Sequence, residues 1–344
     1  MKIKTFIGWD IGGSNTKISI IKSNKAKSEV HEIELWHDAG LSKLKKLILD
    51  LGTNQNGTYH GITLSGEMCD IFPSRKNGIN TILSFFKKFS SNTYVYSSSG
   101  FIKLHKIREH KKVASMNWYS VGEMISKKID NCIIIDMGST TTDFIMIKNN
   151  TIINKREDDF TGINNDELLY TGFLRSPIYA LTDEVRVNMI SYKVIPENFS
   201  SMADIYQILK IIDIKYDYSS RADRRSKTIL NSYKRVARSF GFDFKHNHKK
   251  IIEKLCQEIM HIHITKIYRS LRIIIKKNSY KNNNVKIIGL GIGITLIKKM
   301  VNKYNMTYIN MNTVLKNHPV RFDKKTLIHF PSYAVAYLLR EKHE

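Results

Sequence analysis

The sequence predicts an α/β protein with two similar halves, because one strand-turn-strand pattern occurs twice. The first copy has a strand at residues 4–10, a glycine turn and a second strand at 17–22. The second copy has a strand at 132–136, a Gly/Ser/Thr turn and a strand at 142–147. Each first strand ends in an aspartate, and helical patterns alternate with further strands. Duplication with alternating strands and helices favours mixed sheets covered by helices over a β-sandwich.

The other elements follow from hydrophobic periodicity. In the first half we expect strands at 30–35, 59–64 and 94–97, and helices at 42–51 and 78–89. In the second half we expect a strand at 151–155, a polar helical insertion at about 173–248, a long helix at 251–275, a strand at 286–290, and helices at 294–304 and 333–340. The repeat places a domain boundary between a first lobe, 1–128, and a second lobe, 129–344.

Composition limits the classes of partner. The 344 residues are 42% hydrophobic and 25% charged, as in ordinary globular proteins. The 55 Lys and Arg residues exceed the 31 Asp and Glu residues, which gives a net charge of +24. This excess is spread along the chain, carried mainly by lysine, and accompanied by no nucleic-acid-binding motif. We therefore expect an anionic small-molecule substrate rather than a nucleic acid, and the sequence leaves the oligomeric state open.

Cysteine usage and hydropathy predict the compartment. The three cysteines lie far apart and form no Cys-x-x-Cys pair, which is typical of a reducing environment. No apolar run has the length that a membrane-spanning helix needs, and no secretory signal is visible. We expect a cytoplasmic protein without a membrane partner.

Both repeated turns have the composition of phosphate-binding loops. Glycines allow close approach of the backbone to a phosphate, hydroxyl and amide groups add donors, and a carboxylate can hold Mg²⁺ directly or through water. We expect Asp10 and Asp136 to be catalytic and metal-binding, with the two hairpins clamping a di- or triphosphate. The expected phosphate contacts are Gly12, Gly13, Ser14 and Asn15 in the first turn, Gly138, Ser139, Thr140 and Thr141 in the second, and Gly289 and Gly291 in a Gly-rich turn at 287–293.

These three glycine-containing segments resemble the two phosphate motifs and the nucleoside motif of the actin/Hsp70/sugar-kinase superfamily. Over most of its length the chain resembles the hydantoinase/oxoprolinase-like group of that superfamily. The segments that carry this resemblance are 7–13, 64–70, 114–118, 135–143, 169–177 and 199–206. The resemblance implies a two-lobed actin-like ATPase (ribonuclease H-like) fold, with duplicated mixed sheets, a helical insertion and the ligand between the lobes.

The resemblance also implies a reaction. Similar proteins act in methanofuran biosynthesis and in tetrahydromethanopterin-linked one-carbon metabolism. In the first case an (aminomethyl)furanylmethyl diphosphate and γ-glutamyltyramine form an ether and diphosphate is released. For this chain we expect Mg²⁺ as cofactor, held by the two aspartates. We expect no requirement for ATP, because apolar Leu290, Ile292 and Ile294 flank the glycines where a nucleoside would bind. Two alternatives remain open: an ATP-dependent kinase or hydantoinase/oxoprolinase-type hydrolase, and a non-catalytic actin-like nucleotide switch.

Four further residues are candidates for this reaction. Glu67, expected to be catalytic, and Asp70 follow a predicted strand, where they could hold a metal or the aminomethyl ammonium, or only cap the next turn. Asn117 could contribute to a substrate wall. Arg175 could contact a phosphate or the glutamyl carboxylate, or form a surface ion pair.

One segment departs from the pattern of the group. Where relatives usually have Ala-Asp-Gly-Arg, this chain has Ala-Asp-Arg-Arg at 222–225. Loss of the glycine removes a conformationally permissive position. A role of Asp223 in the site and a plain charged loop are equally good interpretations.

Overall fold

The structure, a computed structural model, describes residues 4–52, 57–280 and 285–344. The chain forms two compact units. The first comprises Met1–Ile134, Ile145–Asn165 and Ile309–Glu344, and the second comprises Ile135–Phe144 and Asp166–Tyr308. The boundary expected from the sequence put residues 129–134, 145–165 and 309–344 in the second lobe, but the contacts group all three with the first unit. The last segment joins it because the C-terminal helix α11 (Phe330–His343) packs against its central strands.

A mixed six-stranded sheet forms the centre of the first unit, in the order β3-β2-β1-β4-β5-β6. Its strands are β1 (Thr5–Gly12), β2 (Asn15–Lys22), β3 (Lys25–Glu32), β4 (Thr58–Ser65), β5 (Thr93–Ser97) and β6 (Gly100–Lys103). Strand β1 is antiparallel to β2 and parallel to β4. The third strand starts earlier than the predicted 30–35, because Ser23 takes a positive φ of 53° and closes a tight turn after β2.

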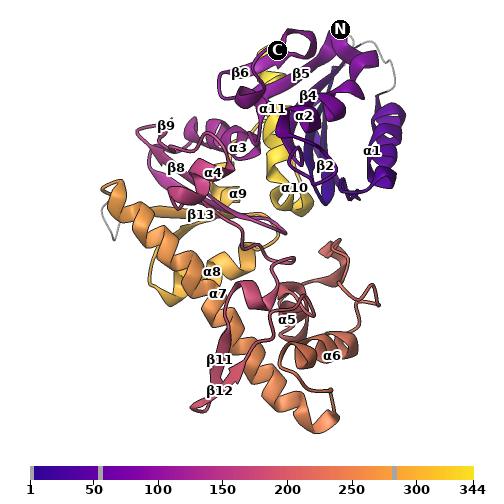
Figure 1. Cartoon of the computed structure of the whole chain (residues 1–344). Coiled ribbons are helices and arrows are strands. Elements are labelled where there is room, and N and C mark those ends of the chain that lie inside the picture. Colours follow the sequence, from indigo (N-terminus) through magenta and orange to yellow (C-terminus); the bar gives the residue numbers. More distant parts are fainter. Residues whose placement is uncertain (1–3, 53–56, 281–284) are drawn as a thin grey trace. The chain divides into compact units, whose positions relative to one another are not determined.

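Successive side chains of β1 point to opposite faces of the sheet, and each face is covered by different helices. On one face, Gly8 leaves room for α11, since a Cβ there would lie 2.0 Å from the carbonyl oxygen of Ser332. On the other face, Trp9 and its neighbours join a core formed with α1 (Asp38–Leu51) and α2 (Arg75–Ser84). Figure 1 shows α1 and α11 on opposite sides of this sheet. Helix α3 (Asn117–Ser126), which was not expected from the sequence, packs against α11.

A second mixed sheet has the order β10-β8-β7-β13-β14, with β9 paired to β8. Its strands are β7 (Cys132–Met137), β8 (Thr142–Lys148), β9 (Thr151–Ile152), β10 (Leu168–Leu169), β13 (Lys286–Leu290) and β14 (Thr307–Ile309). The short helix α4 (Asp159–Asn164) belongs to the first unit, and α9 (Met311–Val314) and α10 (Lys324–Ile328) precede α11. Helices α7 (Lys249–Lys277) and α8 (Ile294–Lys303) confirm the expectations for 251–275 and 294–304.

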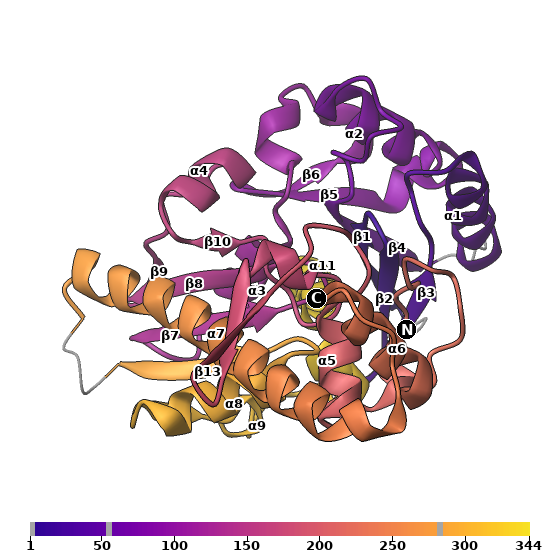
Figure 2. The same ribbon diagram turned by 60° about the horizontal axis from the view of Figure 1, so that its bottom comes forward.

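The sequence predicted a helical insertion at 173–248, but the insertion is not purely helical. It contains α5 (Met202–Ile208) and α6 (Ile229–Ser239), which lie next to α7 in Figures 1 and 2, and also the hairpin β11 (Glu184–Val187) and β12 (Ile190–Lys193). The hairpin turn consists of Asn188 and Met189, both at positive φ. The strands went unnoticed because methionine stands where such turns usually have glycine.

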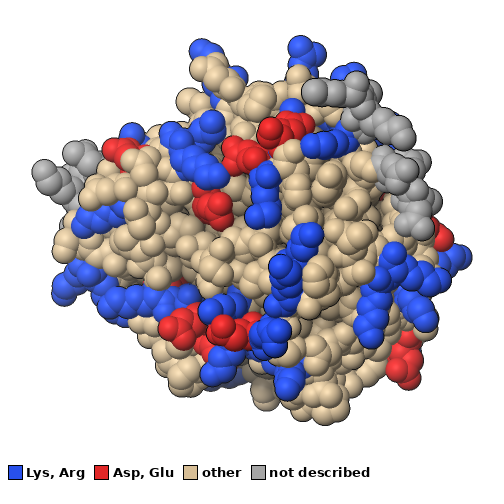
Figure 3. Space-filling model, turned by 90° about the horizontal axis from the view of Figure 1, so that it is seen from above, with Lys and Arg blue, Asp and Glu red and all other residues tan. Residues whose placement is uncertain are grey.

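Surface charge agrees with the even distribution seen in the sequence. On the face drawn in Figure 3, Lys and Arg side chains are scattered and acidic side chains lie among them. Among the residues that the structure describes, no helix is long and apolar enough to cross a membrane.

Candidate functional site

The turn predicted to bind the first phosphate, called the first phosphate turn below, is the β1–β2 hairpin, and Asp10 lies just before it. The Asp10 residue is 1% exposed. Lys17, its partner in the antiparallel register, donates from Nζ to Oδ2 at 3.1 Å, and Ser65 at the end of β4 donates to Oδ1 at 3.3 Å. The sheet thus brings a carboxylate, a cation and a hydroxyl to one point beside the turn.

The segment after β4 packs directly onto this turn. A Cβ on Gly66 would lie 2.6–2.9 Å from the backbone of Gly12 and Gly13, and a Cβ on Gly13 would lie 2.9 Å from Sγ of Cys69. The Gly13 carbonyl accepts from the Leu35 N–H at 2.7 Å. Two backbone segments in such close contact hold the turn, with Ser14 half-buried and Asn15 buried behind it.

Glu67 follows Gly66 and is completely buried. Its Oε1 accepts a 2.9 Å hydrogen bond from Oγ of Ser115 and lies 3.9 Å from Nε of Arg75. Among the described residues, Oε2 has no hydrogen-bond partner. Burial raises the pKa of the Glu67 carboxyl, and its own backbone N–H, the Ser115 hydrogen bond and the Arg75 charge oppose this rise. The carboxyl is therefore held by one oxygen and unsatisfied at the other.

The other two candidates in this unit are more open. Asp70 lies in an exposed turn, and Asn117 is half-buried at the start of α3, where its carbonyl accepts from Ser120. The sequence missed Ser115 and Arg75 as partners of Glu67. Ser115 belongs to segment 114–118, which carried the family resemblance, so the signal was present at the level of the segment.

The second phosphate turn, between β7 and β8, lies in the second unit. It is closed by a 2.9 Å hydrogen bond from the Gly138 N–H to the Thr141 carbonyl. The Ser139 carbonyl accepts from the N–H groups of Leu174 and Arg175, at 3.1 and 2.9 Å. Thr140 is half-buried in the same turn. Arg175, with an exposed side chain, is thus tied by its backbone to this turn, a placement that the sequence had not specified.

Asp136 is half-buried and lies against the glycine turn that follows β13. Gly291 has φ +79°, and a Cβ there would lie 2.5 Å from Oδ1 of Asp136 and 2.4 Å from the Met137 carbonyl oxygen. The turn is shorter than the predicted 287–293, because residues up to Leu290 belong to β13. Gly289 lies inside that strand, where its Cα faces Ile297 and Tyr308. Only Gly291 of this pair lies beside a predicted site residue.

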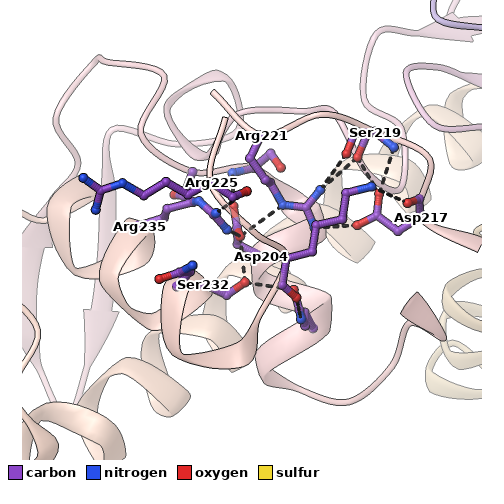
Figure 4. Close-up of polar contacts among 12 residues, drawn as sticks. Asp204, Asp217, Ser219, Arg221, Arg225, Ser232 and Arg235 are labelled. Carbon is purple, nitrogen blue, oxygen red and sulfur yellow. Dashed lines mark hydrogen bonds and ion pairs between the residues drawn. The ribbon is translucent and has the colours of Figure 1, made fainter. Parts of the chain in front are cut away.

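A buried ion-pair network fills the insertion (Figure 4). Asp204 on α5 accepts from Nη1 of Arg235 at 2.9 Å, from Nε of Arg221 at 3.3 Å and from Oγ of Ser232 at 2.8 Å. Arg221 also pairs with Asp217. The side chains of Asp204, Asp217, Arg221 and Arg235 are each at most 2% exposed. Charges buried this deeply are tolerated because they are paired.

The network explains the segment that departs from the family pattern. Asp223 accepts from Nε of Arg235 and from the Arg225 N–H, each at 3.0 Å. Burial works against ionisation of Asp223, but these hydrogen bonds and the arginine charges leave its pKa below the usual value. Arg224, in the place of the usual glycine, has a φ of 53°, a left-handed conformation that glycine adopts more readily. Asp223 thus has a structural role in the insertion.

The acidic residues of the two turns are candidate Mg²⁺ ligands. Within the described ranges, no group of three or more His, Cys, Asp or Glu side chains could hold a metal ion. Mg²⁺ usually takes only one or two carboxylates and completes its shell with phosphate oxygens and water. Asp10 supplies hard oxygen ligands beside the first turn and Asp136 beside the second, so each donor fits such a mode of binding.

These features define an actin-like ATPase fold, which known structures share. The chain matches a nucleotide-free acetone carboxylase with a TM-score of 0.60 and 10% identity, over 97% of this chain and 70% of that one. It matches a ROK family glucokinase from Streptomyces griseus, in complex with glucose and AMPPNP, with a TM-score of 0.50 and 10% identity, over 98% and 99%.

The chain belongs to the hydantoinase/oxoprolinase family, whose profile matches residues 59–317. It is also similar to the (4-{4-[2-(γ-L-glutamylamino)ethyl]phenoxymethyl}furan-2-yl)methanamine synthase of Methanocaldococcus jannaschii, with 28% identity over 355 residues that cover 99% of both chains. The synthase of the same name from Methanococcus vannielii is 28% identical over 222 residues, which cover 64% of this chain and 96% of that protein.

Proposed function

We propose that this protein is a transferase that joins an (aminomethyl)furanylmethyl diphosphate to γ-glutamyltyramine, forming an ether and releasing diphosphate. The observation that carries the proposal is the similarity to the Methanocaldococcus jannaschii synthase over 99% of both chains. The name of that enzyme describes a product in which a phenoxymethyl ether connects a γ-glutamylaminoethyl phenol to a furan methanamine. The acceptor oxygen is therefore a phenol.

The two turns support a diphosphate leaving group. Glycines and hydroxyl residues surround each turn, and Lys17 lies beside Asp10 at the first, where an ammonium group can neutralise phosphate charge. Mg²⁺, when bound, supplies further positive charge to the leaving diphosphate. Asp10 and Asp136 are the proposed carboxylates for the ion, and Arg175, Asp70 and Asn117 are proposed substrate contacts.

ATP is not part of the proposal. The glycine turn after β13 is flanked by apolar Leu290 and Ile292, which offer no hydrogen bond to a ribose hydroxyl, and an unpaired buried hydroxyl costs about 1–3 kcal/mol. We therefore expect Mg-ATP to bind weakly and to be unnecessary for turnover. Calorimetric titration with Mg-ATP and with the furan diphosphate compares the two ligands, and micromolar ATP affinity with ATP-dependent activity would favour a kinase or hydrolase.

The direct test supplies purified protein with Mg²⁺, the furan diphosphate and γ-glutamyltyramine, and measures diphosphate and ether in equal amounts. Replacing Asp10 or Asp136 by asparagine should remove most activity, about 100-fold or more, while leaving the fold intact. Product formation without Mg²⁺, or near-normal turnover of Asp136→Asn, would contradict these roles. If the protein forms no ether with any acceptor, and binds a nucleotide without turning it over, it would be a nucleotide switch.

A further inference from the structure

We propose that Glu67 is the group that takes the proton from the acceptor phenol, through its unpaired Oε2. This inference rests on the proposed ether-forming reaction. In that step the phenol O–H bond breaks and the proton passes to Oε2. The oxygen electron pair forms the new C–O bond to the furanylmethyl carbon, and the bond from that carbon to the diphosphate breaks, with its electron pair leaving on the diphosphate.

The first argument is position. Gly66 packs against the backbone of Gly12 and Gly13 in the first phosphate turn. Glu67 is the next residue along the chain, so its backbone lies close to that turn. In a diphosphate ester, the carbon that reacts is bonded to a phosphate oxygen. A group that deprotonates the attacking oxygen must therefore lie close to the phosphate site, as Glu67 does.

The second argument is rigidity. A Cβ on Gly78 of α2 would lie 2.2 Å from the Glu67 carbonyl oxygen, so glycines hold the backbone of Glu67 between the phosphate turn and α2. Ser115, which donates to Oε1, takes a positive φ of 50°. Such backbone conformations cost free energy and persist where the surrounding structure enforces them, often at functional sites. The carboxyl is thus fixed in orientation by its Oε1 side.

The third argument is the unsatisfied oxygen. Buried polar atoms in folded proteins are nearly always hydrogen-bonded, and an exception needs an explanation. Within the described part of the chain, Oε2 of Glu67 has no donor. The missing donor is explained if Oε2 accepts its hydrogen bond from the phenol hydroxyl of the bound substrate.

The fourth argument is the electrostatic surroundings. The charged groups near the carboxyl are Arg75 on α2 and Asp159 on α4, whose oxygen Oδ2 lies 3.9 Å from Nη2 of Arg75. Burial is the largest influence and raises the pKa of Glu67. A base with a pKa closer to the working pH transfers protons more effectively than an ordinary glutamate. The nearby arginine disfavours the alternative that Glu67 binds a substrate ammonium.

Partly exposed side chains lie around Arg75, the cation beside the Glu67 carboxyl. Arg75, whose side chain is 26% exposed, contacts the sulfur of Met68, which is 54% exposed. Phe160, the residue after Asp159, is 74% exposed. The surroundings of Arg75 therefore include exposed apolar side chains, which suit an aromatic acceptor ring.

The test compares Glu67→Gln with the wild type on two acceptors, γ-glutamyltyramine and a ring-fluorinated analogue with a more acidic phenol. With γ-glutamyltyramine, kcat should fall by about 100-fold or more, with KM values little changed. With the fluorinated acceptor the loss should shrink at least about tenfold, because a more acidic phenol depends less on a base. Glu109→Gln, the same change at an exposed residue, should behave as the wild type.

Equal losses with both acceptors would overturn the inference and leave the ether-forming reaction standing. A wild type that forms no ether overturns both. If Glu67→Gln fails to fold, Ser115→Ala gives an independent test. Loss of the hydrogen bond to the charged carboxylate should raise the pKa of Glu67 and move the acid limb of kcat/KM to higher pH. An unmoved acid limb would also overturn the inference.

Discussion

Glu67 in the first unit and Asp204 in the second are both completely buried acids, but their surroundings differ. Asp204 accepts hydrogen bonds from two arginines and a serine at Oδ1, and from the Ser201 N–H at Oδ2. Glu67 has one serine and an arginine 3.9 Å away at Oε1, and no hydrogen-bond partner among the described residues at Oε2. Complete pairing makes a buried carboxylate a structural element, whereas incomplete pairing leaves a group that can react with a substrate.

The largest expected effect comes from breaking the paired acid. Asp204→Asn leaves the guanidinium groups of Arg221 and Arg235 buried with one carboxylate fewer, and should lower the free energy of unfolding by about 3–5 kcal/mol. The lower figure is expected, because Asp217 and Asp223 still accompany the arginines. Denaturant unfolding measures the change. Asp213→Asn, a change at a more exposed acid, should alter stability by no more than about 0.5 kcal/mol.

The second prediction concerns the backbone contact that places Glu67. In Gly66→Ala the new methyl group meets the backbone of the first phosphate turn, and such overpacking should cost about 1–3 kcal/mol and impair ether formation. Gly100→Ala is the comparison, because no atom lies within 4 Å of a Cβ there and only its positive φ is strained. Loss of activity in both variants alike would show that the contact at Gly66 is not special.

The third prediction uses pH to compare the acids. Because the folded-state pKa of Glu67 is raised above its ordinary 4.5, its contribution to stability is present below that pH and is lost as pH rises through the folded pKa. Glu67→Gln should therefore gain stability relative to wild type at neutral pH, and this gain should disappear in acid. The effect should be smaller than that of Asp204→Asn and opposite in sign. Thermal unfolding between pH 4 and 8 measures the stability difference between the variant and the wild type. A stability gain that does not change with pH would contradict a raised pKa of Glu67.

The smallest effect is expected at the left-handed residue next to the Asp204 network. Arg224→Gly relieves a positive φ that costs an ordinary residue about 1–2 kcal/mol, but glycine also has more freedom in the unfolded chain. A net gain of about 0.5 kcal/mol should follow in denaturant unfolding. Arg224→Ala keeps the positive φ and should give no gain, so equal stabilisation by both variants would assign the effect to the side chain.

Much of the fold could be predicted because it depends on local patterns. The β1–β2 and β7–β8 hairpins, α7 and β13 were expected from hydrophobic runs and glycine turns within about 10–30 residues. The β11–β12 hairpin and α3 were missed. The former lacks a turn glycine, and the latter is buried on most of its surface, which removes the polar face by which a helix is recognised.

The family and the identities of the candidate residues were determined by the sequence alone, because glycine, aspartate and glutamate at fixed spacing survive as motifs. Only the tertiary structure decided which residues meet. It brought Ser115 and Arg75 to Glu67, joined Arg221 and Arg235 at Asp204, and placed 309–344 with the first unit. These partners are far apart in sequence, and whether a carboxylate is paired depends on burial and distance, which a linear pattern does not contain.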